Sequence, residues 1–249
     1  MNLYISVINH GHDDLITSRG TLPTLAKNYT VVLRSNTTPT DALIQYSEDA
    51  GIYLIHDGYT KGFATNNNAV FDYCHSMLGM TDKDYFLVLN PDVDISTESM
   101  ERLLNLSIAK DSDISAINLF RDEAFTVYDN SIRHYHELLA PLKSLLGIKR
   151  TDVYDKDVIS EPIEIDWAAG SFLLFKAMTY RKLEGFDEKY FMYFEDADLC
   201  TRANRSGYRV TYFPSIKAVH FASHQNRKLL SKHFYWYVKS SIRYHLRNI

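Results

Sequence analysis

Short apolar runs alternate with amphipathic stretches through the first half of the chain. Four runs, rich in β-branched and aromatic residues, have the length and pattern of strands buried on both faces of a sheet: 3–9, 29–36, 51–57 and 84–90. The segments between them have helical spacing and cover residues 13–28, 38–50 and 64–80. Thr38 and Pro39 have the form of an N-cap followed by a first-turn proline. A helix over 96–110, capped by Ser96 or Thr97, and a strand over 113–120 complete the series.

This alternation of strands and helices predicts an α/β fold with a Rossmann-like, mostly parallel sheet flanked by helices. In such a doubly wound sheet, ligands bind beyond the carboxyl ends of the strands. The rhythm is lost over 121–163, which we interpret as an insertion or an acceptor-side segment, and it returns at 164. A helix is expected to follow the aromatic run "KYFMYF", over 196–207.

The chain has 249 residues, of which 45% are hydrophobic, enough for one large domain or two small ones. Two cysteines, Cys74 and Cys200, lie far apart and fit no metal or disulfide spacing, so two buried thiols in a reducing compartment are expected. The opening residues lack a basic segment and read as a strand, not as a secretory signal. No stretch approaches the roughly 20 apolar residues of a membrane span, so we expect a cytoplasmic protein.

The charge is distributed unevenly along the chain. Residues 1–198 carry 17 basic and 31 acidic side chains, a formal charge of −14, whereas residues 199–249 carry ten basic side chains and no acidic one. If 227–247 is helical, one side presents cations and the other is mostly apolar. The cations are Lys228, Lys232, Lys239, Arg243 and Arg247, and the opposite side holds Leu230, Phe234, Tyr237, Ser241 and Tyr244. Either the basic side rests on an anionic membrane, or the apolar side packs on the domain and the cations are solvated.

Two aspartates, Asp92 and Asp94, follow the strand at 84–90 directly, where such a sheet binds its ligands. A D-x-D pair at this position can share a hard divalent cation that in turn holds a diphosphate, although isolated pairs also cap helices or solvate turns. Neither G-x-x-x-x-G-K-[ST] nor G-x-G-x-x-G occurs. A bound nucleotide must therefore be held in another way.

Four blocks in a fixed order carry a family resemblance: "ISVINHGH", "GFATNNNAVF" at 62–71, "LNPDVD" at 89–94, and residues 166–221. In them the chain resembles the inverting glycosyltransferases of family 2, which have the GT-A fold, and especially the bacterial rhamnosyltransferases of O-antigen assembly. The resemblance implies a GT-A domain over 1–225, with a nucleotide-sugar-binding half at 1–119 and an acceptor and catalytic half at 120–225. Residues 226–249 would form a separate basic amphipathic helix.

The resemblance also implies a donor site. Asp92 and Asp94 match the metal-diphosphate motif for Mg²⁺ or Mn²⁺, with Asp94 as the direct ligand, and His220 matches a histidine near the metal or diphosphate. The expected nucleotide-sugar contacts are Asn9, His10, Asn36, Asn67, Asn68 and Asp92. Two simpler interpretations stay open: His220 as an ordinary strand-end histidine, and the asparagines as structural residues of a helix N-terminus. Many relatives have Asp-Asn where this chain has Ser35-Asn36, which leaves the nucleotide base open.

In the block "YFEDADLC", the resemblance makes Asp196 the catalytic base and places Glu195 beside it in the acceptor pocket. The apolar neighbours are expected to raise the pKa of Asp196, as suits a base. Asp198 lies about 200° round a helix from Asp196, so we interpret it as a charge that favours the helix N-terminus. Trp167, Gly170 and Ser171 match residues near the acceptor sugar, although Trp167 also fits a buried core.

These observations predict an inverting transfer of L-rhamnose from dTDP-L-rhamnose to undecaprenyl-diphosphate-linked N-acetylglucosamine, at the cytoplasmic face of the membrane, in cell-surface polysaccharide synthesis. One alternative is a transferase of the same fold for galactose, galactofuranose or N-acetylglucosamine. Another is a non-enzymatic module that binds an anionic surface or nucleic acid. The charge of −14 over residues 1–198 and the lack of a nucleic-acid motif argue against nucleic acid as a partner.

Overall fold

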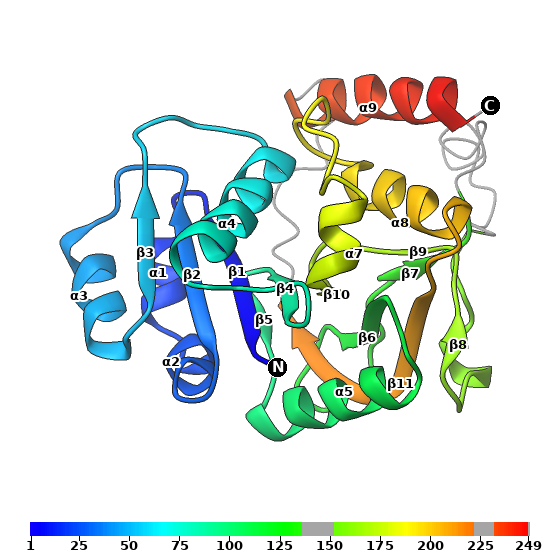
Figure 1. Cartoon of the computed structure of the whole chain (residues 1–249), viewed down its shortest axis with the longest axis horizontal. Coiled ribbons are helices and arrows are strands. Elements are labelled where there is room, and N and C mark those ends of the chain that lie inside the picture. The colour runs from blue at the N-terminus through cyan, green and yellow to red at the C-terminus, as the bar shows by residue number, and fades with distance from the viewer. Residues whose placement is uncertain (136–151, 222–231, 249) are drawn as a thin grey trace.

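The computed structural model describes residues 1–135, 152–221 and 232–248, which form a nine-stranded sheet between layers of helices (Figure 1). One half of the sheet is parallel, in the order β3-β2-β1-β4. Its strands are β1 (Leu3–Asn9), β2 (Thr30–Ser35), β3 (Tyr53–His56) and β4 (Tyr85–Leu89), all within two residues of their predicted ends. Because these strands run in one direction, their carboxyl ends share one edge of the sheet.

The helices of this half are α1 (Asp13–Thr17), α2 (Thr21–Ala26), α3 (Asp41–Ala50) and α4 (Phe63–Met77). The predicted single helix over 13–28 is wrong, because it is broken before α2. Pro23 explains the break, since a proline within a continuous helix would clash with the carbonyl four residues earlier and is tolerated only in a first turn. The predicted cap of the next helix is also wrong: Thr40, not Thr38, accepts a hydrogen bond from the Leu43 N–H, and Pro39 lies outside the helix.

Beyond β4 the sheet is mixed, in the order β4-β10-β6-β11-β5, with β8 paired to β11. These strands are β5 (Val93–Asp94), β6 (Ile114–Phe120), β8 (Ile163–Glu164), β10 (Phe172–Lys176) and β11 (Val210–His220). β7 (Ile132–Arg133) and β9 (Trp167–Ala168) pair separately. The remaining described helices of the domain are α5 (Thr97–Ala109), α7 (Ala177–Lys182), α8 (Glu195–Arg205) and a 3₁₀ turn at Lys156–Val158. Strand β10 runs antiparallel to both neighbours, a feature that the simple doubly wound prediction lacked.

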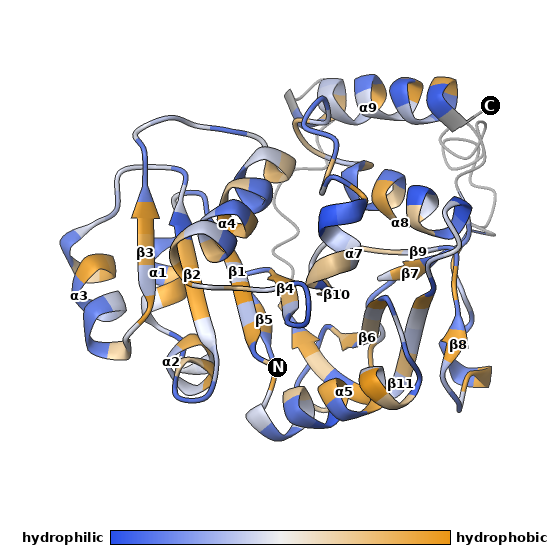
Figure 2. Cartoon of the chain, in the orientation of Figure 1, coloured by the Kyte–Doolittle hydropathy of each residue, from blue (hydrophilic) through white to orange (hydrophobic). Residues whose placement is uncertain are grey.

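The sheet separates two hydrophobic layers, and its strands form the apolar centre of the molecule (Figure 2). Helices α4, α7 and α8 cover one face, and α1, α2, α3 and α5 cover the other. Cys74 and Cys200 are both buried and unbridged, as predicted. Among the described residues, no helix has the length and apolar character needed to cross a bilayer.

Helix α9 (Lys232–Asn248) lies over α8 at the end of the chain (Figure 1). Tyr244 contacts the Phe194 ring at 5.5 Å between centroids, and its hydroxyl lies 2.9 Å from that of Thr201. The expected helix is present, and part of its apolar side packs on the domain. Its cations are not all turned outward: Arg243 and Arg247 both bind Asp187, at 2.8 and 2.6 Å. Lys228 and Leu230, and the side chain of Lys232, lie outside the described residues.

Candidate active site

A cavity of about 510 Å³ opens at the carboxyl edge of the parallel strands, within the usual range for a small-molecule site. The first half of the chain contributes His10, Asn36, Asn66, Asn90 and Asp92 among others. The opposite wall comes from much later in the sequence and contains Phe191, Met192, His233 and Trp236. The last two belong to α9, so this helix is part of the cavity wall.

Asn36 and His10 reach the cavity through a network after β2. The Asn36 amide accepts from the Lys61 N–H at 2.7 Å and donates to the Lys61 carbonyl at 2.8 Å and to His10 Nδ1 at 3.0 Å. Buried Arg34 donates to Asn66 at 2.7 Å and to Asp57 at 2.5 Å. These bonds hold the 57–62 loop against β2, which fixes the position of the polar groups that face the cavity.

Three predicted donor contacts have their amides directed into the protein. Buried Asn9 bonds to Asp13, Ser35 and the His12 N–H, and buried Asn67 bonds to Ser6 and the Phe63 carbonyl. Asn68 bonds across to the second half of the chain, where it meets Tyr180, Phe186 and Glu188. Their hydrogen bonds fit the structural interpretation of these asparagines. Asn66 and not Asn67 or Asn68 lines the cavity.

Asp92, His220 and Asp129 form a row beside the cavity. His220 Nε2 lies 3.4 Å from Asp92 Oδ1, and its Nδ1 lies 2.7 Å from Asp129 Oδ2. Burial alone would lower the pKa of His220, but the hydrogen bonds to Asp129 and Asp92 outweigh it and raise the pKa to about 9. Burial alone would raise the pKa of Asp92 and of Asp129, but the interaction of each carboxylate with His220 outweighs burial, so both pKa values are lowered. The free site therefore holds an imidazolium between two carboxylates.

The metal expected from the sequence fits part of this donor set. Asp92 offers an oxygen ligand and lines the cavity, and His220 would offer a nitrogen ligand once Nε2 gave up its proton and its contact with Asp92; both are ligands of kinds that Mn²⁺ accepts. Asp94 is engaged differently, because its carboxylate accepts a 2.6 Å hydrogen bond from the Thr21 hydroxyl. In the described part of the chain, no group of three or more His, Cys, Asp or Glu side chains is arranged to hold a metal ion alone. A divalent cation here would thus need further ligands from substrate oxygens or water.

Asp196 lies in the first turn of α8 beside the start of β10. Since β10 runs antiparallel to β4, the residues that precede it, Gly170 and Ser171, lie at the same edge as the ends of the parallel strands. Asp196 Oδ2 accepts from the Gly170 N–H at 2.9 Å, and Oδ1 accepts from the Ala197 N–H at 2.8 Å. Burial raises the pKa of Asp196 against these two bonds.

Gly170 connects Asp196 to the cavity wall. A Cβ at this position would lie 3.1 Å from the Phe63 ring, which would crowd that ring, and 3.7 Å from the Cβ of Asp196, which is ordinary van der Waals contact. Phe63 itself lines the cavity. The position of the carboxylate relative to the cavity is therefore set through close packing around one glycine.

Two buried oxygens near Asp196 have no hydrogen-bond partner in the described structure: Glu195 Oε2 and Ser171 Oγ. Burial raises the pKa of Glu195 well above its ordinary value, and the Asp196 charge adds to the effect. Unpartnered buried polar atoms are uncommon, and at a candidate site they are available to a ligand. Trp167, in contrast, is a core residue: it is 4% exposed and its indole N–H donates to the His134 carbonyl at 2.8 Å.

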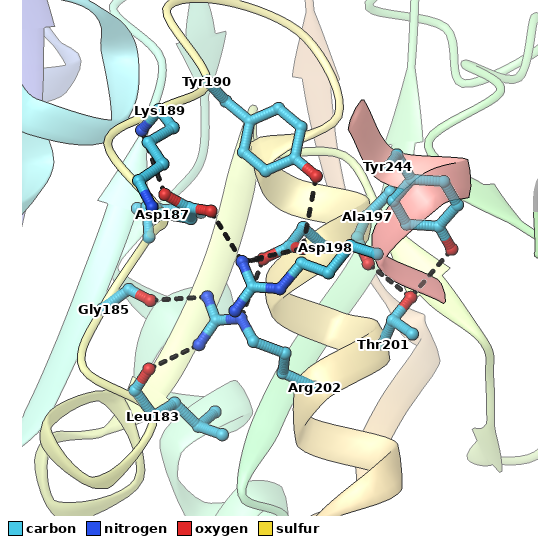
Figure 3. Close-up of polar contacts among 12 residues, drawn as sticks. Leu183, Gly185, Asp187, Lys189, Tyr190, Ala197, Asp198, Thr201, Arg202 and Tyr244 are labelled. Carbon is cyan, nitrogen blue, oxygen red and sulfur yellow. Dashed lines mark hydrogen bonds and ion pairs between the residues drawn. The ribbon is translucent and has the colours of Figure 1, made fainter. Parts of the chain in front are cut away.

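Asp198 lies in a polar cluster with Tyr190 and Arg202 (Figure 3), and none of these partners is shared with Asp196, in line with the helical spacing. It is fully buried, accepts from Arg202 Nε at 2.8 Å and from the Tyr190 hydroxyl at 3.3 Å. Arg202 also donates to the Leu183 and Gly185 carbonyls. Asp198 therefore does more than favour a helix terminus, since it joins α8 to the 183–190 segment.

The chain turns into α8 through two consecutive non-glycine residues in the left-handed region, Tyr193 (φ 69°) and Phe194 (φ 67°). Such conformations cost on the order of 1 kcal/mol or more each and persist where packing enforces them. Phe194 is buried against Tyr237 and Tyr244 of α9. Helix α9 thus supports the turn that places Glu195 and Asp196.

Sequence reasoning missed Asp129, the partner of His220, and the contribution of His233 and Trp236 to the cavity. Asp129 lies in the 121–163 segment, where the pattern indicated no element. Trp236 lies in the C-terminal helix, more than 140 residues after the last of the parallel strands. Neither had a spacing that related it to the strand ends.

Two curated proteins similar to this chain are rhamnosyltransferases, although no protein-family model matches the chain. The rhamnosyltransferase WbbL of Escherichia coli K12 is 36% identical over 97% of this chain and 92% of its own length. The N-acetylglucosaminyl-diphospho-decaprenol L-rhamnosyltransferase of Mycobacterium tuberculosis is 27% identical over 82% of this chain and 69% of its own. The crystal structure of GalNAc-T7 with UDP, GalNAc and Mn²⁺ superposes with a TM-score of 0.65 at 11% identity, covering 98% of this chain and about half (47%) of that one.

Proposed function

Since the chain belongs to the GT-A-fold family 2 glycosyltransferases that include the rhamnosyltransferase WbbL, we propose that it moves L-rhamnose from dTDP-L-rhamnose to undecaprenyl-diphosphate-linked N-acetylglucosamine in cell-surface polysaccharide synthesis. The observation that carries this proposal is the position of Asp196, which is buried and held through Gly170 and Phe63 beside a cavity large enough for a nucleotide sugar. The acceptor is supported by the mycobacterial relative, whose name specifies a lipid-diphosphate N-acetylglucosamine.

The donor would occupy the cavity, with its nucleoside near His10 and Asn36 and its diphosphate near Asp92. Asp92 and His220 would hold a divalent cation, Mg²⁺ or Mn²⁺, which would neutralise the diphosphate charge as it becomes the leaving group. The Mn²⁺ and UDP of the GalNAc-T7 structure support such a pair in this fold. Asp94, predicted as the direct ligand, would join them only by giving up its bond to Thr21.

Inversion of configuration at the anomeric carbon requires a single displacement of the diphosphate by the acceptor oxygen. Asp196 would take the proton from the acceptor hydroxyl as that oxygen bonds to the anomeric carbon, while the bond from this carbon to the diphosphate oxygen breaks on the opposite side. The raised pKa makes Asp196 a stronger base than an exposed carboxylate. Burial and the Asp196 charge raise the pKa of Glu195 and so favour its protonated form, which would donate a hydrogen bond to the acceptor; Ser171 Oγ would be a second contact for the sugar.

We place the reaction at the inner face of the cytoplasmic membrane, where a polyprenyl-diphosphate acceptor would be met. The positively charged last 51 residues support a peripheral association with anionic lipid.

A donor screen tests the proposal: purified protein with Mg²⁺ or Mn²⁺, a synthetic lipid-diphosphate N-acetylglucosamine and a panel of nucleotide sugars. Product is expected with dTDP-L-rhamnose, with inverted configuration at the new linkage. Product from a galactose, galactofuranose or N-acetylglucosamine donor alone would replace the rhamnose assignment with another sugar. Ser35 stands where many relatives have an aspartate, which leaves the nucleotide base open, so the donors have to be compared directly.

A further inference from the structure

Asp129 is held through both of its backbone groups and through its side chain, although it lies where the sequence pattern predicted no element. Its backbone N–H donates to the Leu119 carbonyl at 2.9 Å. Its carbonyl accepts from the Lys156 ammonium at 2.7 Å, and its carboxylate lies 2.7 Å from His220 Nδ1. Leu119 belongs to β6 and His220 ends β11, so Asp129 is fixed against two neighbouring strands of the sheet.

Lys156 is a buried cation for which the proposed reaction has no use. It is 6% exposed, and its ammonium also lies 3.1 Å from Ser131 Oγ and 5.8 Å from the centre of the Tyr212 ring. Burial lowers the pKa of Lys156 to about 8, so the ammonium form that donates these bonds predominates at neutral pH. A buried charge is costly unless it is hydrogen-bonded. Here its bonds hold the backbone around Asp129 in place.

The contact with Asp129 determines which ring nitrogen of His220 lies next to Asp92. An ionised carboxylate only accepts hydrogen bonds, so Nδ1 carries the proton in this contact. The other nitrogen, Nε2, lies 3.4 Å from Asp92 Oδ1, and Asp92 lines the cavity. Turning the ring to exchange the two nitrogens would break the bond to Asp129. Carboxylates that accept from the second ring nitrogen commonly orient metal-binding histidines.

We propose that Asp129 is a positioning residue for the cation site, because it holds His220 with Nε2 beside Asp92, the other proposed ligand. This inference rests on the cation role given to Asp92 and His220 in the proposed function. Asp129 is not among the described residues that line the cavity, and its carboxylate is engaged with Nδ1. It therefore acts on the cation through His220 and not by direct contact.

The test is calorimetric titration of Mn²⁺ into the full chain with dTDP present, for the wild type, Asp129→Ala, His220→Ala and the double variant. Each single change should weaken Mn²⁺ binding by roughly 10- to 100-fold. Since Asp129 acts through His220, the double variant should bind no more weakly than His220→Ala. A general structural defect would instead add to the loss from His220→Ala. Wild-type affinity in Asp129→Ala, or additive losses in the double variant, would overturn the proposal.

Two further variants make the comparison specific. Asp113→Ala is the matched control, since this aspartate precedes β6 at its other end, is 16% exposed against 14% for Asp129, and pairs with Lys176 at 3.0 Å. It should bind Mn²⁺ like the wild type. Asp129→Asn keeps an amide oxygen that can accept from Nδ1, so it should retain more affinity than Asp129→Ala, and it replaces that variant if the alanine chain does not fold. An asparagine variant as weak as His220→Ala would refute positioning by this hydrogen bond.

Failure of this inference can be told apart from failure of the proposed function. A chain that transfers the sugar but binds no Mn²⁺ would exclude the role of Asp129 and leave the transferase proposal in place. A chain that is inactive with every donor would overturn the proposed function, whatever its affinity for Mn²⁺.

Discussion

Asp196 and Asp198 stand two positions apart on α8, and substituting each by asparagine should produce opposite defects. Asp196→Asn keeps the size of the side chain but removes the proton acceptor. General-base catalysis contributes roughly 100- to 10,000-fold, so kcat should fall by that factor while donor affinity stays near the wild-type value. The new amide N–H₂ cannot accept a hydrogen bond, so it leaves the backbone N–H of either Gly170 or Ala197 without its acceptor. The free energy of unfolding should therefore fall by about 1–3 kcal/mol.

Asp198→Asn acts on the buried ion pair with Arg202, in which the aspartate is fully buried. Removing one member of such a pair costs roughly 3–5 kcal/mol, because the remaining charge loses its partner. For a chain of this size, that corresponds to a fall of about 6–20 °C in melting temperature. The folded fraction at low temperature should nevertheless retain turnover, since Asp198 shares no hydrogen-bond partner with Asp196.

The assay measures kcat and donor KM with a lipid-diphosphate acceptor, alongside thermal unfolding of the same preparations. Asp196 has a raised pKa, so the wild-type rate should increase with pH as this carboxyl ionises, at a pH above the ordinary carboxylate range, and Asp196→Asn should lack that limb. Normal turnover in Asp196→Asn would refute its role as the base. Loss of turnover in a stably folded Asp198→Asn would refute the division of roles between the two carboxylates.

Three further predictions concern neighbouring groups. Burial raises the folded-state pKa of Glu195 well above 4.5, so its contribution to stability is full below about pH 4.5 and is lost as the pH rises through the raised pKa. Glu195→Gln should therefore flatten the decline in melting temperature as the pH rises above about 4.5, and an unchanged slope would contradict this. His220→Ala should weaken Mn²⁺ binding by roughly tenfold or more in calorimetry with donor nucleotide present, whereas unchanged affinity would exclude it as a ligand. Trp236→Ala should raise donor KM more than it lowers kcat, because its side chain lines the cavity, and a pure loss of kcat would place it elsewhere in the reaction.

The parallel half of the sheet was predictable because its strands are apolar over nearly their whole length, a pattern that few other structures produce. Asp92 was predicted from a D-x-D pair at a strand end and Asp196 from the family resemblance, and the roles of both stay predictions. Position in the sheet was harder to foresee: nothing in the pattern of 172–176 distinguishes a strand that runs antiparallel from one that runs parallel. That direction is what brings Gly170 to Asp196, so the link between the donor and catalytic sides required the structure.

The C-terminal helix shows a different limit. Its charges and apolar residues were divided into two faces, but the folded helix has three environments: the domain, the donor cavity and the exterior. Arg243 and Arg247 look like solvated cations in sequence and are paired with Asp187 across a distance of about 60 residues. Removing residues after Asn226, a simple test of membrane binding, would also delete Trp236 from the cavity wall, and point substitutions are therefore the better choice.

The order of the strands along the chain also determines when each of them can pair during synthesis. Strands β3, β2, β1 and β4 occupy residues 3–89 and can pair as soon as they leave the ribosome, whereas β6 has both its neighbours, β10 and β11, more than 50 residues downstream. Between those moments the nascent sheet has open edges at β4 and β6, which are prone to wrong pairing. The parallel half of the sheet would thus exist before α8, which carries the proposed base, and β10 is the strand that closes the gap between β4 and β6.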